Sequence, residues 1–142
     1  MTYDYRARKT VIVLASNLAP GIAANVMGHL AFSIGHRAPR EDMGRDLLPD
    51  ASGIGHHGIS KYPVIVTKVK PGRLRQFIAE ARAVSGLLLV DYPQAMQDTG
   101  HDDELAAAIA AQQEETMSYL GAAAHGDRDA LDKIAGKFML YN

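Results

Sequence analysis

Apolar and polar positions along the chain fall into blocks that predict strands and helices in turn. Thr10–Ala15 is an unbroken apolar run, as expected of a strand buried on both faces. After a polar turn, Ile22–Ile34 carries apolar residues at every fourth position, which predicts a helix with one face in the core. Pro20 suits the first turn of that helix. The pattern therefore predicts a strand–turn–helix unit whose turn lies at the carboxyl end of a buried strand.

The rest of the chain repeats this alternation. Further strands are expected at Tyr62–Val69, Leu87–Asp91, Thr116–Ala123 and Lys137–Tyr141, and further helices from Pro71 to Gly86, at Asp102–Glu115 and at Asp127–Ala135. Residues 1–142 are thus expected to form one α/β domain, a three-layer α/β/α sandwich with a mixed sheet whose strand order these signals do not determine. The stretch from Gly35 to Ser60 is too long for a simple connection, so it is either functional or a small hairpin excursion with a turn at Asp50–Gly53.

Composition narrows the classes of protein that fit. The chain has 142 residues, 47% of them apolar, and no cysteine, which excludes a disulfide framework and a thiol nucleophile. Neither a signal peptide nor an apolar run of membrane-spanning length is present, so we expect a cytoplasmic protein without a membrane partner. Net charge is −1, divided as +6 over residues 1–90 and −7 over residues 91–142. This asymmetry leaves a nucleic-acid partner open, although charges that merely coat solvated helices are the favoured explanation.

Short motifs at both ends of the chain resemble a known family. Asn17-Leu18, Pro20-Gly21 and Ala23–Asn25 are similar to the N-terminal signature of the type-two peptidyl-tRNA hydrolases, and Leu131–Leu140 is similar to their closing helix and strand. A closer likeness, carried by Asp50–Gly53, Thr99–Asp102 and Gly121–Gly126, is to an uncharacterised family called domain of unknown function two thousand. The resemblance spans almost the whole chain. It implies a peptidyl-tRNA hydrolase II-like fold.

The resemblance also exposes departures at reactive positions. Gly21 stands where the hydrolases have a lysine, Asn17 where they have an aspartate, and Ala95 where they have a threonine, whereas Asp91 matches their aspartate. Residues that act as a unit lose activity steeply when one is removed. We therefore expect no faithful hydrolysis of peptidyl-tRNA.

Candidate site residues gather where open α/β sheets bind ligands, beyond the carboxyl ends of strands. The candidates for general base are Asp91, which ends a strand, and His101, which precedes two aspartates. The candidates for ligand binding are Ser16, Asn17, Gly21, Asn25, His57 and Thr99. We expect the two groups to converge on one cleft. The alternatives are a helix cap at Asp102 beside His101 and a surface pair at His56-His57.

Metal and cofactor sites are not expected. No His-x-x-x-His pair occurs, and adjacent His56 and His57 would point apart in an extended chain. Gly53–Gly58 spells G-x-G-x-x-G, but it neither follows a strand nor opens a helix, so it lacks the context of a dinucleotide fingerprint. A Gly-x-Ser-x-Gly elbow is also missing.

Three function classes remain open. The loss of the lysine favours a binding module for a small or nucleotide-like ligand. The alternative is a hydrolase of an ester or amide with Asp91 or His101 as general base. The third is an interaction protein, because the helix around Leu105 and Ile109 is otherwise almost all alanine. That helix, and the pairing common among the resembled hydrolases, predict a homodimer. Fold alone does not choose between the three.

Overall fold

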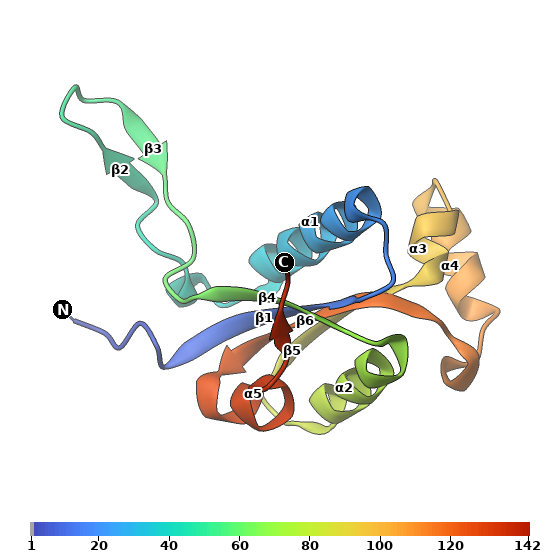
Figure 1. Ribbon diagram of the computed structural model, residues 1–142. Helices are drawn as coiled ribbons and strands as arrows, with labels where there is room; N and C mark the ends of the chain where they lie inside the picture. Colours follow the sequence, from blue (N-terminus) through green and yellow to red (C-terminus); the bar gives the residue numbers. More distant parts are fainter. Residues whose placement is uncertain (1) are drawn as a thin grey trace.

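A five-stranded sheet with helices on both faces forms the body of the molecule, and a two-stranded hairpin projects from it (Figure 1). The computed structural model describes residues 2–142. The strands are β1 (Arg8–Ala15), β2 (Leu47–Pro49), β3 (Gly55–His57), β4 (Val64–Val69), β5 (Leu88–Pro93), β6 (Tyr119–Asp127) and β7 (Met139–Leu140). The helices are α1 (Pro20–Arg37), α2 (Pro71–Ala83), α3 (Gln94–Asp98), α4 (Asp102–Ala110) and α5 (Arg128–Ala135), with short 3-10 segments η1 (Arg40–Asp42) and η2 (Glu114–Thr116).

The sheet is mixed, with strand order β5-β6-β1-β4-β7. β1 pairs in parallel with β4 and antiparallel with β6, and β5 pairs antiparallel with β6. β1, β4 and β5 therefore end at the same edge of the sheet, called here the carboxyl edge, and begin at the opposite amino edge. The apolar run predicted to be doubly buried is central as expected, since Val11–Ala15 are each no more than 2% exposed.

Helices cover both faces, so the molecule has three layers (Figure 1). α1 packs on one face through Ala23, Val26, Leu30 and Ile34, at the spacing that predicted a core-facing stripe. Ile22, expected in that stripe, is 37% exposed because it lies in the first turn of the helix. α2 and α5 cover the other face with a second apolar cluster around Phe77.

Small residues in β6 let both helical layers approach the sheet. Ala122, Ala123 and Ala124 are fully buried and alternate between the two core clusters. A Cβ at Gly121 would lie 3.0 Å from Val26 of α1 and 3.1 Å from Leu14 of β1, tighter than an ordinary contact, so any larger residue here would displace these side chains.

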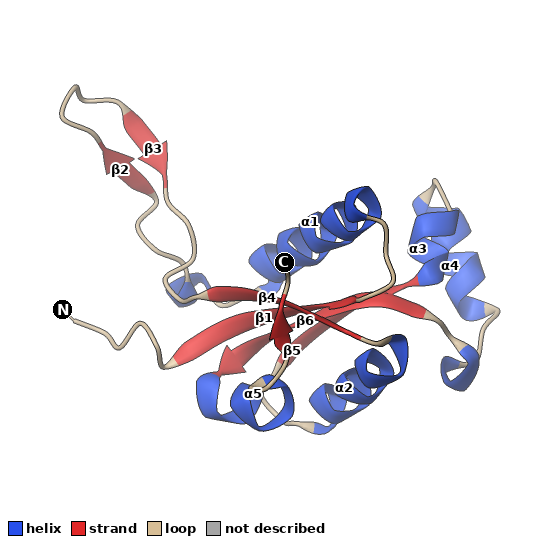
Figure 2. Cartoon of the chain, in the orientation of Figure 1, coloured by secondary structure: helices blue, strands red, loops and turns tan. Residues whose placement is uncertain are grey.

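Several boundaries differ from the sequence expectation. The helix predicted at Asp102–Glu115 ends at Ala110, the strand predicted at Thr116–Ala123 runs from Tyr119 to Asp127, and α3 was not expected. The long connection after α1 contains the β2–β3 hairpin (Figure 2), one of its two anticipated forms. The predicted turn at its tip forms because the Asp50 carboxylate accepts hydrogen bonds from the backbone N–H groups of Ser52 and Ile54. No helix within residues 2–142 combines the length and apolar character needed to cross a membrane.

Candidate functional site

Two neighbouring strands bring a hydroxyl and an imidazole together at the amino edge of the sheet. Thr10 of β1 lies directly opposite His125 of β6 in the antiparallel register. Side chains alternate along a strand, so both face α1, as do Ile12 and Ala123 two positions along their strands. Thr10 Oγ1 and His125 Nδ1 are 2.8 Å apart. This pair lies at the opposite end of the sheet from the cleft expected from the sequence.

The η1 segment adds a carboxylate to the pair. His125 Nε2 lies 2.6 Å from Asp42 Oδ2, and Arg8 Nε donates to the same oxygen at 3.0 Å. Thr10, Asp42 and His125 are each no more than 5% exposed. Because Arg8 stands on β1 two positions before Thr10, one sheet edge supplies both the hydroxyl and the cation that balances the buried Asp42 carboxylate. We call these four residues the Thr10–His125 network.

The position of the proton on His125 follows from the ionisation of Asp42. Burial alone would raise the pKa of Asp42, but the hydrogen bonds from His125 and Arg8 outweigh it and hold the pKa below its usual value. An ionised carboxylate only accepts hydrogen bonds, so His125 Nε2 carries a proton. In the neutral imidazole this proton leaves His125 Nδ1 as an acceptor, and the Thr10 hydroxyl then donates to it.

An apolar cavity of about 370 Å³, the inner cavity, opens over this network. It lies between the C-terminal part of α1, the η1 segment and the base of the hairpin. The residues that line it are Thr10, Ala31, Ile34, Gly35, Ala38, Asp42, Met43, Gly58, Ile59, Ser60, Val64 and His125. Apolar walls with a few convergent polar groups are typical of small-molecule sites.

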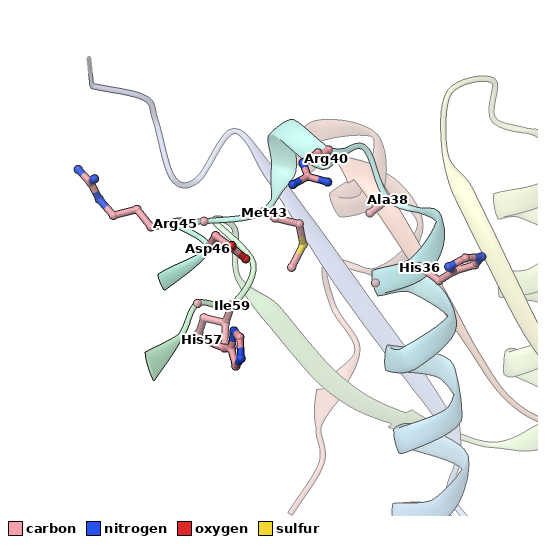
Figure 3. Close-up of a pocket in the computed structure, with 11 residues that line it drawn as sticks. His36, Ala38, Arg40, Met43, Arg45, Asp46, His57 and Ile59 are labelled. Atoms are coloured by element: carbon pink, nitrogen blue, oxygen red, sulfur yellow. The ribbon is translucent and has the colours of Figure 1, made fainter. Parts of the chain in front are cut away.

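A second, more polar cavity of about 460 Å³, the outer cavity, adjoins the first. The two share Gly35, Ala38, Met43, Gly58 and Ile59. Met43 extends into the space between α1 and the hairpin base, whereas Arg45 points away from it (Figure 3). Arg40, Asp46 and His57 also line this cavity, so its polar groups carry no single sign of charge.

Two glycines let the hairpin base form the cavity wall. Gly44 N–H donates to Ile59 O at 2.8 Å, and Gly58 N–H donates to Asp46 O at 3.0 Å. A Cβ at Gly58 would lie 1.7 Å from Arg45 O, and one at Gly44 would lie 2.8 Å from Ile59 O. The two backbone segments approach so closely that a larger residue at Gly58 must displace one of them.

Most of the residues predicted from the sequence do lie near the carboxyl edge. Ser16, Asn17, Gly21 and Asn25 are exposed in the turn after β1 and the first turns of α1. Thr99 and His101 come together with Met96 and Leu105 in a separate pocket of about 240 Å³ beside α4. The N-terminal end of α1 lies at the same end of the sheet as α3 and α4 (Figure 1).

The expected convergence on one cleft is nevertheless wrong. Asp91 faces the α2 layer, where Arg82 Nη2 donates to its carboxylate at 2.9 Å, whereas Met96, beside His101, packs in the α1-side core. Burial raises the pKa of Asp91 even though Arg82 opposes it. His57 lies in β3, in the hairpin at the amino edge (Figure 1). Strand alternation turned Asp91 to the other face, and the connection after α1 leaves from the opposite edge.

The Thr10–His125 network was not predicted from the sequence. One available signal was His125 itself, which follows three alanines in the GAAAHG segment and would need a polar partner once buried. No local signal marks Asp42, which is 83 positions from His125. Within residues 2–142, no three His, Cys, Asp or Glu side chains are grouped so as to hold a metal ion.

Comparison with known proteins places the chain without assigning an activity. The structure is similar to that of a protein of unknown function from Agrobacterium tumefaciens strain C58, with a TM-score of 0.84 and 24% identity over 96% of this chain and 98% of that one. This likeness shows a shared fold. No curated protein matches the chain. The family model described as protein of unknown function (DUF2000) matches residues 8–142, and the chain belongs to that family, as its motifs indicated.

Proposed function

We propose that the chain binds a small, uncharged organic molecule in the inner cavity, with an apolar body against α1 and the hairpin base and one polar group at Thr10 and His125. A single observation carries the proposal: the buried Thr10–His125 network lies on the floor of an otherwise apolar cavity. The site lies at the amino edge of the sheet, opposite the cleft first expected.

The charges at the floor of the inner cavity favour an uncharged ligand over a nucleotide. The outer cavity does not decide the question, because Arg40, Arg45, His36 and His57 line it together with one acid, Asp46. At the floor, Asp42 is already balanced by Arg8, so an additional charge would be buried without a partner at high cost. An amide or ester group satisfies the floor without that cost.

The test is a titration with benzamide, an apolar ring bearing one amide, followed by NMR of the backbone N–H groups. We expect saturable shifts at Gly35, Gly58 and Ser60, which line the inner cavity. Gly100 and Asp102 beside α4 should not shift. The proposal is wrong if Gly100 and Asp102 alone respond, because the ligand would then bind at the carboxyl edge, or if benzamide shifts no inner-cavity residue.

A matched pair of variants on α1 makes this test specific. Gly35 lines both cavities, and a Cβ there meets nothing within 4 Å. Gly35→Leu should therefore fill the cavity without straining the helix and abolish the benzamide shifts. Gly28 is seven positions earlier on the same helix, has equally open space and lines neither cavity. Gly28→Leu should leave binding unchanged, and both variants should remain folded, since leucine favours a helix more than glycine.

The likeness to type-two peptidyl-tRNA hydrolases stays part of the proposal, as an account of the fold and not of the activity. Gly21 is exposed and has no side chain to replace the family's lysine, and Ala95 is 5% exposed. We expect no efficient release of tRNA from a blocked aminoacyl-tRNA, either by the chain or by its Asp91→Ala variant. Efficient release would overturn this expectation.

A further inference from the structure

The Thr10 side chain has the surroundings of an activated nucleophile. Its hydroxyl lies 2.8 Å from His125 Nδ1, and His125 Nε2 lies 2.6 Å from Asp42 Oδ2. An alcohol paired with a neutral imidazole that is oriented by a carboxylate is the arrangement that makes hydroxyl groups attack carbonyl carbons. Thr10 and His125 both line the inner cavity, so a molecule bound there reaches them.

We infer that Thr10 is an acyl acceptor: it takes the acyl group of a small uncharged ester bound in the inner cavity, with His125 as general base. This inference rests on the proposed binding function and adds a covalent step to it. The network supplies every proton movement that the step requires.

The step balances within the site. Thr10 Oγ1 forms a bond to the ester carbonyl carbon while its proton moves to His125 Nδ1. The bond from that carbon to the alcohol oxygen then breaks, and the alcohol leaves with the proton from His125. In the second half, water attacks the Thr10 ester, His125 takes one proton from the water and returns it to Thr10 Oγ1, and the carboxylic acid leaves.

The backbone of the cavity wall indicates which of the two half-reactions is slow, acylation of Thr10 or hydrolysis of the Thr10 ester. Backbone N–H groups that stabilise an oxyanion must be free to donate, and those of Gly44 and Gly58 already donate to Ile59 and Asp46. The acyl group should therefore transfer readily only from an ester with a good leaving group, and the Thr10 ester should persist. The covalent adduct, more than turnover, is the measurement to make.

The experiment uses p-nitrophenyl acetate and the whole chain. Acetylation is followed by release of p-nitrophenolate and by intact mass, and the modified residue is located by peptide mapping. We expect one acetyl group on Thr10. Thr10→Val, which keeps the shape of the side chain, should lower the rate of acetylation about a hundredfold or more. Thr10→Ser should retain acetylation.

Thr67→Val is the matched control for Thr10→Val. Thr67 lies on β4, is 3% exposed and donates to Ile12 O, so the same substitution removes a buried hydroxyl from the same sheet. It belongs to neither cavity. We expect Thr67→Val to acetylate like the unmodified chain. A loss equal to that of Thr10→Val would assign the effect to folding and overturn the inference.

Asp42 acts only through His125, so its test needs a readout that a loosened fold would not move. The charged groups that face His125 are Asp42, which contacts it, and Arg8, which pairs with Asp42. Asp42→Asn should change which His125 nitrogen holds the proton and so change the shape of the pH profile of acetylation. A rate lowered equally at every pH would leave Asp42 with a structural role and contradict this step.

The outcomes separate this inference from the binding proposal. Benzamide binding in the inner cavity without acetylation of Thr10 overturns the acyl-acceptor inference and leaves the binding proposal intact. Acetylation only of lysines or of exposed histidines also overturns the inference. Absence of both benzamide binding and Thr10 acetylation overturns the two together. Acetylation of Thr10 that Gly35→Leu blocks and Gly28→Leu permits supports both.

Discussion

The two edges of the sheet each hold an aspartate paired with an arginine, buried at Asp42 and half-buried at Asp91, yet the two acids behave in opposite ways. Asp42 and Arg8 are joined at 3.0 Å, and Asp91 and Arg82 at 2.9 Å. The pKa of Asp42 is lowered, whereas that of Asp91 is raised. Burial raises the pKa in both places. His125 and Arg8 together outweigh it at Asp42, while at Asp91 burial outweighs Arg82 and the negative charge of Glu114 adds to it.

The difference teaches that the number of donors, more than the presence of an ion pair, decides whether a buried carboxylate stabilises its charge. The amino edge is built for an ionised acid whose hydrogen bonds orient an imidazole. At the carboxyl edge, the ionised form of Asp91 costs stability because burial opposes its charge. Four measurements test this contrast.

Removing the two acids should have very different effects on stability. Asp42→Ala leaves Arg8 and His125 without their shared acceptor, and we expect unfolding free energy to fall by about 3 kcal/mol, the lower end for breaking a buried pair because Arg8 is partly exposed. Asp91→Asn should change it by less than about 0.5 kcal/mol. Urea unfolding of the two variants measures this. Equal losses would show that the two ion pairs are equivalent.

Crowding at the hairpin base should cost less than the loss of Asp42. Gly58→Ala places a Cβ against Arg45 O, which forces the hairpin away from the cavity. We expect a loss of about 2 kcal/mol and weaker benzamide binding. Gly55→Ala is the control, since its Cβ meets only the flexible side chain of Leu47 at 3.5 Å. The thermal midpoint and the benzamide titration report both effects, and unchanged binding in Gly58→Ala would mean that the hairpin base is not a cavity wall.

The two acids should also separate in pH dependence. With its folded pKa lowered, Asp42 contributes stability that is present above the unfolded value of about 4 and is lost as pH falls through the folded pKa. The contribution of Asp91 to stability has the opposite sign. Because its folded pKa is raised, the ionised Asp91 lowers the unfolding free energy near neutral pH, and this loss disappears as pH falls through that pKa. Unfolding free energy is measured from pH 7 downward for Asp42→Asn and Asp91→Asn. The deficit of Asp42→Asn should shrink in acid. A deficit that stays constant contradicts the assignment.

The smallest effect on the fold is expected for substitutions in α4, the helix predicted to form the homodimer contact. Ala107 and Ala111 are exposed, and none of the α4 residues is buried. If the predicted homodimer forms through this helix, Ala107→Glu should split it without lowering the stability of the monomer or the binding of benzamide. Sedimentation equilibrium at micromolar concentration measures the mass. A mass near 15.3 kDa at every concentration would remove the dimer, and a dimer unaffected by the substitution would move the contact elsewhere.

Local sequence patterns predicted the architecture well where the residues of one helix or strand are enough to show which of its faces is buried. The period of α1 placed Val26, Leu30 and Ile34 in the core, and the apolar run of β1 placed it at the centre of the sheet. Boundaries were predicted less well where tertiary contacts set them. Tyr119 begins β6 because its backbone pairs with Pro93 of β5, a partner that the residues around Thr116 do not reveal.

The candidate site shows the same division more sharply. The sequence predicted polar residues where the first and third strands end, and the structure has Asn17 after β1 and Asp91 inside β5, two residues before its end. It did not predict that alternation would turn Asp91 toward Arg82, because the face of an edge strand depends on how the sheet is assembled. The rule that ligands bind at carboxyl ends also directed attention away from Thr10, which stands at the start of its strand.

Hydrophobic periodicity and short motifs are local, so they predicted an α/β fold of the DUF2000 family without knowledge of distant partners. The position of the candidate site depended on the assembled fold. Thr10, Asp42 and His125 come from three separate segments, and each looks ordinary in its own neighbourhood. Strand register places the hydroxyl against the imidazole, and the return of the chain after α1 delivers the carboxylate. The chemistry of the group exists only when burial removes water from all three residues at once.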